Sequence, residues 1–213
     1  MSRVYKLIAV CAVTVVAAVG VYSQEVKKDD TKPVVVDQQT TQQTTKTPDY
    51  VFPTHRERFN RYVKSTVGPF RLAWTVGAAG IDQWRDHPEE WGQGMKGFGR
   101  RYASNLGQNA IQQTVTYGLD EAFGLDTGFR KSTSEGFGPR LKDALLQNIT
   151  SRTKSGKRVI SVPRFAGAYS GAIISRATWY PDRYSYKDGL RAGTGNLLTG
   201  FGFNLVREFV FNW

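Results

Sequence analysis

The chain has 213 residues and a formal net charge of +11 at pH 7, from 29 lysines and arginines against 18 aspartates and glutamates. A charge of this size and sign favours anionic partners. The only cysteine is Cys11, so an internal disulfide is excluded, and so are a cysteine nucleophile and a thiolate-bound metal in the rest of the chain.

The first 23 residues have the organisation of a secretory signal peptide. Arg3 and Lys6 precede an unbroken apolar run from Leu7 to Val21. This run has about 15 residues, fewer than the ~20 that a membrane-spanning helix needs. We therefore predict cleavage after Ser23 rather than retention as an anchor. The mature chain is expected in the periplasm or at the periplasmic face of a membrane.

Residues 24–49 are predicted to form a disordered linker. They include no aromatic residue and contain the low-complexity run QQTTQQTT. Such a segment buries too little apolar surface to offset the entropy lost on ordering. From Tyr50 onward aromatic, glycine and arginine residues become frequent. Residues 50–213 are therefore predicted to form one domain with a modest core.

The predicted domain begins with two helices separated by a break. Thr54 and Glu57 have the spacing of a capping box, and apolar residues then recur at helical spacing as far as Val67. Gly68 and Pro69 interrupt this helix. Pro69 suits the first turn of a second helix, which has the sequence PFRLAWTVGAAGIDQW.

Further elements follow in the middle and at the end of the chain. A long helix is predicted over 97–123, with Gly124 as its C-cap. Ser132 and Glu135 have capping-box spacing and precede a helical stretch over 136–152. The remaining predicted elements are, in chain order, a turn at 154–157, a short β segment at 158–161, a helix opened by Pro163, an aromatic loop WYPDRYSYKDG, and a last element from Leu190.

The end of the chain, GFGFNLVREFVFNW (200–213), fits two structures. At a period of two it resembles the terminal strand of a small outer-membrane β-barrel, with only Arg207 out of place. At a period near 3.6 it is an amphipathic helix. The capping boxes within the domain favour the helix. The predicted fold is therefore mainly α, a single compact bundle of about five or six glycine-rich amphipathic helices, and the barrel is the alternative.

One repeated segment suggests a binding site for an anion. Residues 97–111 and 136–150 align without gaps, and each begins with GFG followed closely by arginine. If each GFG opens a helix, Arg100, Arg101 and Arg140 lie in first turns, where the helix macrodipole disfavours cations. An anion held by these arginines and by free helix N–H groups explains the placement. The alternative is a set of surface ion pairs.

No residues with the pattern of a catalytic, cofactor or metal site were found. Gly92–Gly97 matches G-x-G-x-x-G, but a polar turn precedes it where a dinucleotide site needs a strand. The two histidines, His55 and His87, lack a known metal-ligand spacing. We therefore predict a non-enzymatic protein without cofactor or metal. Small residues at Gly77–Gly80 and Gly167–Ala172 allow close helix approach, either inside the bundle or at a membrane surface.

Several segments carry a family resemblance: RERFNRYVKSTVGP, FGRRY, FGPR, AGAYSGAIISRATWYPD and NLVREF. Together they resemble a family of uncharacterised, predicted secreted proteins of acidobacterial type. The resemblance covers about residues 50–210. The family has no assigned activity, so the resemblance supplies no functional residues.

These features predict an exported, non-enzymatic protein of the cell envelope. Without Arg3 and Lys6 the mature chain keeps 27 of its 29 basic residues against 18 acidic ones. The expected partners are anionic lipid headgroups or an acidic envelope component, because export argues against nucleic acid. The oligomeric state stays open. The alternative is a small outer-membrane barrel or pore-like protein with residues 200–213 as its terminal strand.

Overall fold

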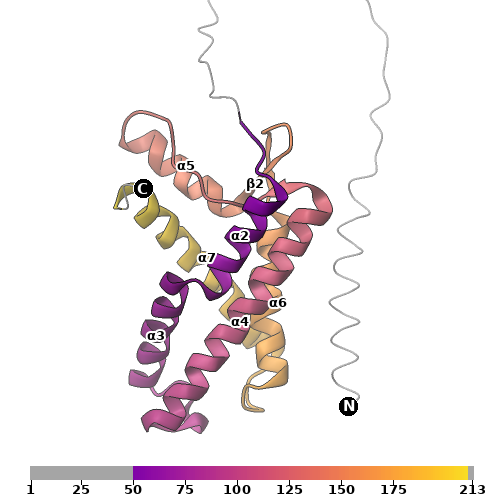
Figure 1. Ribbon diagram of the computed structural model, residues 1–213. Helices are drawn as coiled ribbons and strands as arrows, with labels where there is room; N and C mark the ends of the chain where they lie inside the picture. The colour runs from indigo at the N-terminus through magenta and orange to yellow at the C-terminus, as the bar shows by residue number, and fades with distance from the viewer. Residues whose placement is uncertain (1–49, 211–213) are drawn as a thin grey trace, which may run out of the picture. The chain divides into compact units, whose positions relative to one another are not determined.

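The computed structural model describes residues 50–210, and the predicted signal peptide and linker lie outside this range. From Val51 onward the described residues form one compact unit, and the predicted mainly α fold is confirmed for this unit (Figure 1). The helices are α2 His55–Val67, α3 Pro69–Trp84, the 3₁₀ helix η1 Glu89–Trp91, α4 Gly94–Phe123, α5 Phe137–Ile149, α6 Val162–Thr178 and α7 Tyr186–Phe209.

A small antiparallel sheet lies at one end of the helices. Its strands are β1 Leu125–Asp126, β2 Thr150–Thr153 and β3 Arg158–Ile160, in the order β1-β2-β3. The predicted turn at 154–157 joins β2 to β3, in register from Thr150 opposite Ile160 to Arg152 opposite Arg158. The sequence indicated β3 but not β1 or β2. The sequence predicts that the preceding helix extends to residue 152, but it ends at Ile149 and residues 150–152 belong to β2.

Several helix ends follow their local sequence signals. Both halves of the capping box are present at Thr54 and Glu57. Pro69 opens α3 directly after Gly68, whose extended backbone ends α2. Gly124, in the left-handed region at φ 60°, is the C-cap of α4. Each of these predictions is confirmed.

The second predicted capping box is wrong. Helix α5 begins at Phe137, and its N-cap is Gly136 with φ 87° and no side-chain cap. The hydroxyl of Ser132 instead donates to Asp143 Oδ2 at 2.7 Å, and its oxygen accepts from the backbone N–H of Ser134 at 3.2 Å, so Ser132 belongs to the loop before α5. A capping box that the sequence did not indicate is present at Ser185 and Asp188, where it starts α7.

The tail is helical, so its interpretation as a terminal strand is wrong for the described residues. Helix α7 is continuous from Tyr186 to Phe209. Its buried polar residues Asn204 and Glu208 are four apart and both face α5. Asn204 Nδ2 donates to the carbonyl of Ala144 at 3.4 Å, and Glu208 pairs with Arg140. Only a helical period brings these two polar side chains to one partner.

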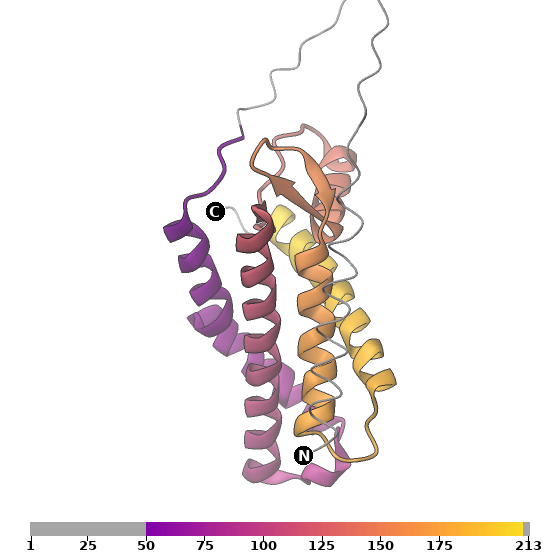
Figure 2. The same cartoon turned by 90° about the vertical axis from the view of Figure 1, so that its right-hand side faces the viewer.

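Glycines allow the helices to pack closely, with α6 between α4 and α7 (Figure 2). A Cβ on Gly171 would lie 2.6 Å from the carbonyl oxygen of Gln108 in α4, and a Cβ on Gly189 would lie 2.8 Å from the Cα of Ile173 in α6. For these helices the small residues pack inside the bundle, one of the two arrangements expected. Four of the five buried hydrophobic residues are correspondingly small, the fully buried Ala79, Ala144, Ala168 and Ala172, and the fifth is Leu125.

Candidate anion-binding surface

Arg101, one of the three predicted anion-binding residues, is buried and bonded within the protein. Its side chain is fully inaccessible, and its guanidinium donates to five acceptors. They are Gln83 Oε1 (2.5 Å), Gly92 O (2.6 Å), Pro88 O (2.8 Å), His87 O (2.9 Å) and Asp86 Oδ1 (3.2 Å). Arg101 therefore holds the segment between α3 and α4 in place and has no donor left for an external anion.

Arg140 is also occupied. Its Nε donates to Glu208 Oε1 at 2.8 Å, and one Nη donates to the Glu208 backbone carbonyl at 2.7 Å. The guanidinium also lies 5.0 Å from the ring centroid of Phe209. The Glu208 carboxylate has no solvent exposure, so Arg140 supplies the positive charge that its burial requires.

Arg100 is the member of the predicted set that remains accessible. It is exposed, and no hydrogen bond or ion pair joins it to another described residue. Because α4 begins at Gly94, Arg100 lies in the second turn, where the macrodipole has little effect. The three arginines are not brought together: α4 begins at one end of the bundle and α5, which carries Arg140, lies at the other (Figure 1).

Two further cations lie at the same end of the bundle as Arg100. Arg85 directly follows α3, and Lys96 precedes Arg100 by four residues on the same exposed face of α4. Neither has an ion pair with another described residue. We call Arg85, Lys96 and Arg100 the cationic surface. Met95, 82% exposed, lies beside it in the sequence.

The start of α4 also lacks a side-chain cap. Its N-cap residue, Gln93, makes no capping hydrogen bond. The Gln93 amide instead donates to the backbone carbonyl of Gln83 at 3.1 Å and to Asp86 Oδ1 at 2.7 Å. The first N–H groups of α4 are therefore left for water or a ligand. Free helix N–H groups close to three cations suit an anion.

Acidic side chains do not neutralise this surface, because many of them pair with other arginines. The closest pairs are Arg61–Asp126 (2.5 Å), Arg58–Glu121 (2.7 Å), Arg140–Glu208 (2.8 Å), Arg183–Glu90 (2.8 Å) and Arg158–Asp143 (2.9 Å). Asp86, close to the cationic surface, accepts from Arg101 and Gln93. Glu89 and Glu90, on the same segment, pair with Arg183, so these carboxylates have partners whereas Arg85, Lys96 and Arg100 have no ion pair with a described residue.

One buried carboxylate has no arginine pair within hydrogen-bond distance. Asp120, on the last turns of α4, accepts from the hydroxyl and the backbone N–H of Thr127 at 2.6 and 3.3 Å. Its other oxygen is buried without a partner among the described residues. Burial raises the pKa of Asp120 from 3.8 to about 6, and the nearby charge of Asp126 adds to the effect.

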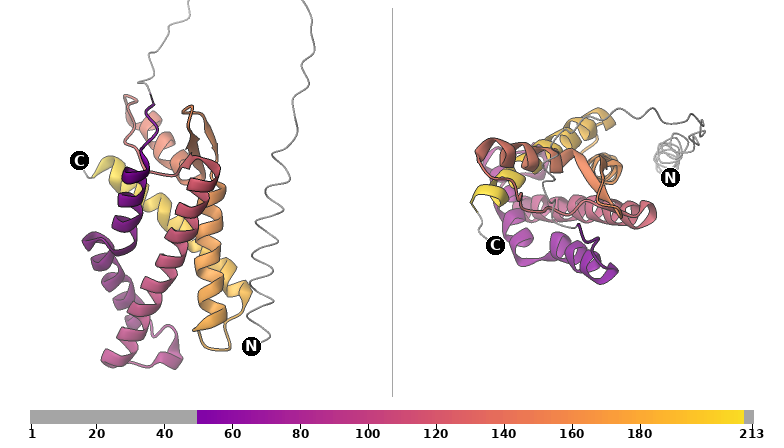
Figure 3. Two further views of the ribbon diagram at one scale, coloured as in Figure 1. Left: turned by 45° about the vertical axis from the view of Figure 1, so that its right-hand side comes forward. Right: turned by 90° about the horizontal axis from the view of Figure 1, so that it is seen from above.

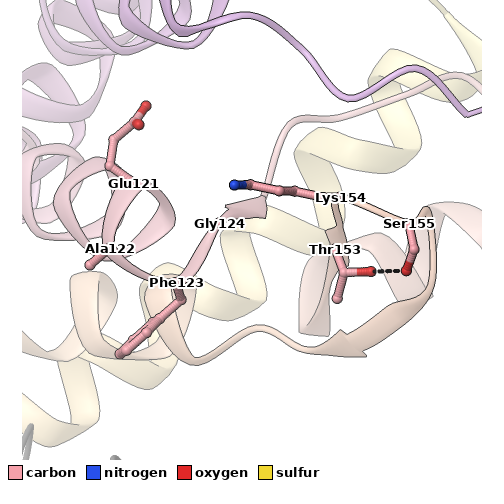
Figure 4. Close-up of a pocket in the computed structure, with 7 residues that line it drawn as sticks. All are labelled: Glu121, Ala122, Phe123, Gly124, Thr153, Lys154 and Ser155. Carbon is pink, nitrogen blue, oxygen red and sulfur yellow. Dashed lines mark hydrogen bonds between the residues drawn. The ribbon is translucent and has the colours of Figure 1, made fainter.

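A shallow pocket of about 490 Å³ lies between the end of α4 and the β2–β3 turn (Figure 4). The Lys154 side chain extends across the C-cap of α4, where a cation is favourable because helix carbonyls carry partial negative charge. Thr153 and Ser155 share a hydrogen bond of 3.0 Å, and Glu121 on the facing wall pairs with Arg58. The arrangement explains how α4 ends, and it pairs no nucleophile with a general base.

Comparison of the chain with protein-family models, curated proteins and solved structures gave no match. The family resemblance of the sequence therefore stays a prediction. Within residues 50–210, no helix has both the length and the apolar character needed to cross a membrane. Within the same range, no three histidine, aspartate or glutamate side chains are grouped so that they could hold a metal ion.

Proposed function

We propose that this protein is an exported, non-enzymatic component of the cell envelope that associates peripherally with an anionic membrane. The observation that carries the proposal is the cationic surface: Arg85, Lys96 and Arg100 are exposed and have no acidic partner among the described residues. Lipid phosphates would meet these side chains together with the uncapped start of α4.

Two of the three arginines predicted to bind an anion do not belong to the proposed site. Arg101 and Arg140 support the fold through internal bonds, so of the three arginines in the original prediction only Arg100 is retained in the proposed site. Arg85 and Lys96 replace the other two. A basic residue near an anionic membrane contributes about 1 kcal/mol, so the three together contribute about 3 kcal/mol, or roughly a hundredfold in affinity.

Vesicle sedimentation tests the membrane proposal. The protein should bind vesicles that contain anionic phospholipid, fail to bind neutral vesicles, and lose binding steeply between low and physiological salt. The triple variant Arg85→Gln, Lys96→Gln, Arg100→Gln should bind about a hundredfold more weakly at low salt. Equal binding to neutral and anionic vesicles would refute the function itself.

A matched control separates a defined surface from overall charge. Arg56, Lys142 and Lys157 are also exposed, and they lie on α2, on α5 and in the β2–β3 turn, toward the other end of the domain (Figure 1). Their combined change to glutamine removes the same charge and should leave binding largely intact. If both triple variants weaken binding equally, the attraction is general and the cationic surface is not its site.

The export part of the proposal has its own test. The predicted cleavage site lies outside the described residues, so it is supported only by the sequence. The intact mass of protein recovered from the native host should correspond to a chain that begins at Gln24. A recovered chain that still contains Cys11 would show that the leader is retained, and would replace export with anchoring.

A further inference from the structure

Helix α3 turns its polar side chains inward and its large apolar side chains outward. Arg71 donates to Asn109 Oδ1 and Asp82 accepts from Asn105 Nδ2 at 3.0 Å, so both charged residues of α3 face α4. Of the six large apolar residues of α3, Leu72 is half-buried and the other five are exposed: Phe70 56%, Trp74 43%, Val76 49%, Ile81 54% and Trp84 86%. This is the reverse of the usual arrangement for a helix at a protein surface.

Four of these five exposed residues, all except Val76, form one face of the helix, which lies at the outer edge of the domain (Figures 1 and 3). Phe70, Trp74, Ile81 and Trp84 are spaced by four, seven and three residues, which places them along one side of a helix. The ring of Phe203 from α7 packs against Phe70 and Trp74, with centroids 6.3 and 4.5 Å away. Phe203 thus supports the rings from one side and leaves much of their surface exposed.

Small residues alternate with the large ones on this face. A Cβ on Gly77 or Gly80 would meet no atom within 4 Å. Glycine inside a helix is destabilising relative to alanine, and within the bundle Gly167 and Gly171 have a packing reason, because α4 lies against them. Open glycines such as Gly118 also occur, so openness alone decides nothing. On α3 the open glycines lie between bulky apolar neighbours.

The pattern is symmetric about Gly77. Phe70 and Trp84 lie seven residues to either side of it, Ala73 and Ile81 four, and Trp74 and Gly80 three. If a second α3 crossed antiparallel with its own Gly77 at the centre, each large residue at the inner positions would meet a small one.

We propose that two copies of this chain form a homodimer through their α3 faces, packed antiparallel about a two-fold axis at Gly77. Trp74 then lies against Gly80 of the partner subunit, Ile81 against Ala73 of the partner subunit, and Phe70 against Trp84 of the partner subunit. A two-fold interface uses the same patch on both copies. The α3 face meets that requirement because its large and small positions complement each other.

The size of the face fits a stable dimer. With side-chain areas of about 150–250 Å², the exposed fractions of Phe70, Trp74, Ile81 and Trp84 amount to roughly 500 Å² of apolar surface. Homodimer interfaces are about 65% apolar, which corresponds to roughly 800 Å² per subunit. A standard interface buries about 800 Å² per partner.

The charge distribution also favours this face. Two copies of a chain with a net charge of +11 repel each other over most of their surface. On the α3 face the charged groups of Arg71 and Asp82 are engaged with α4, so the copies meet there without opposing charges. A lipid surface could also bury the apolar residues, but binding to lipid does not explain why small residues alternate with large ones.

Sedimentation velocity of the purified full chain without lipid gives the first test. The protein should sediment with twice the mass of its 23.8 kDa chain. A Cβ on Gly77 meets no atom within 4 Å, so Gly77→Leu should leave the fold intact and raise the dimer dissociation constant at least a hundredfold. Gly118→Leu, at an equally open glycine of α4, should have no such effect.

Cysteine cross-linking tests the antiparallel register, with Cys11→Ser as the background. Gly77→Cys should form a disulfide between copies under oxidation, because the two-fold axis brings the two Cα atoms within disulfide range. Ala73→Cys should not cross-link to itself but should cross-link to Ile81→Cys. Self-linking of Ala73→Cys would indicate parallel helices and overturn the proposed geometry.

A monomer at 100 μM, or a Gly77→Leu variant that stays dimeric, would overturn the dimer. A monomer whose tryptophan fluorescence shifts on neutral vesicles would assign the α3 face to lipid instead. These outcomes are distinct from failure of the proposed function, because the cationic surface binds anionic vesicles through other residues and the dimer assay contains no lipid.

Discussion

The change Arg101→Gln should destabilise the protein far more than the same change at its neighbour. The Arg101 guanidinium is fully buried and donates five hydrogen bonds, three of them to backbone carbonyls of the segment between α3 and α4. Glutamine can replace at most two of these donors. Unsatisfied buried acceptors cost about 1–3 kcal/mol each, so we expect a loss of about 3–5 kcal/mol, a large fraction of the 5–15 kcal/mol typical of a domain.

Urea unfolding followed by circular dichroism measures this loss. With a slope of about 2 kcal/mol per molar urea, Arg101→Gln should lower the midpoint by about 2 M. Arg100→Gln is the matched control, because Arg100 is exposed and makes no bond to another described residue. It should change the stability by less than about 0.5 kcal/mol. Equal effects at the two positions would refute the burial of Arg101 and the loop arrangement built on it.

Two further predictions concern buried groups. The folded pKa of Asp120, about 6, is above its unfolded value of 3.8, so this group stabilises the fold below pH 4 and the contribution is lost as pH rises through 6. Asp120→Asn should therefore be more stable than wild type by about 1–3 kcal/mol at pH 8 and equally stable at pH 4. A gain in stability that is independent of pH in urea unfolding would contradict this. Gly171→Ala should lower the melting temperature, because its Cβ would lie 2.6 Å from the Gln108 carbonyl oxygen. Gly118→Ala should raise the melting temperature, because nothing lies within 4 Å of its Cβ and alanine favours helix. If Gly171→Ala melted at a higher temperature than Gly118→Ala, α6 would not approach α4 this closely.

The features that could be predicted from the sequence are mostly those that act over a few residues. The Thr54–Glu57 capping box joins side chains three residues apart, and Gly124 ends α4 through its own backbone conformation. The apolar period near 3.6 in the tail was also sufficient to predict that it is helical. The failed capping box shows the limit, because Ser132 bonds to Asp143, eleven residues away. No local pattern indicates which of two such partners a hydroxyl will choose.

The candidate site shows the same limit. Arg100 and Arg101 are adjacent and of the same type, so both are predicted from the sequence to bind an anion. Successive residues of a helix point about 100° apart, so one of them faces the segment between α3 and α4 while the other faces outward. The start of α4 three residues before the GFG motif also removes the macrodipole argument. The exposed face of α3 was visible as a run of apolar residues, but its outward direction depends on contacts with α4.

Helix α4 fixes the distance between the two ends of the domain. Residues 51–54 join the bundle beside the C-terminal end of α4, where Arg130 donates to the Val51 carbonyl at 3.0 Å and Arg58 pairs with Glu121. The cationic surface lies at the other end, around Lys96. From Lys96 to Glu121 the helix rises about 1.5 Å per residue, which corresponds to about 40 Å. A surface bound at the start of α4 is therefore held about 40 Å from the point at which the preceding chain joins the fold. A continuous helix rather than a flexible loop sets this distance.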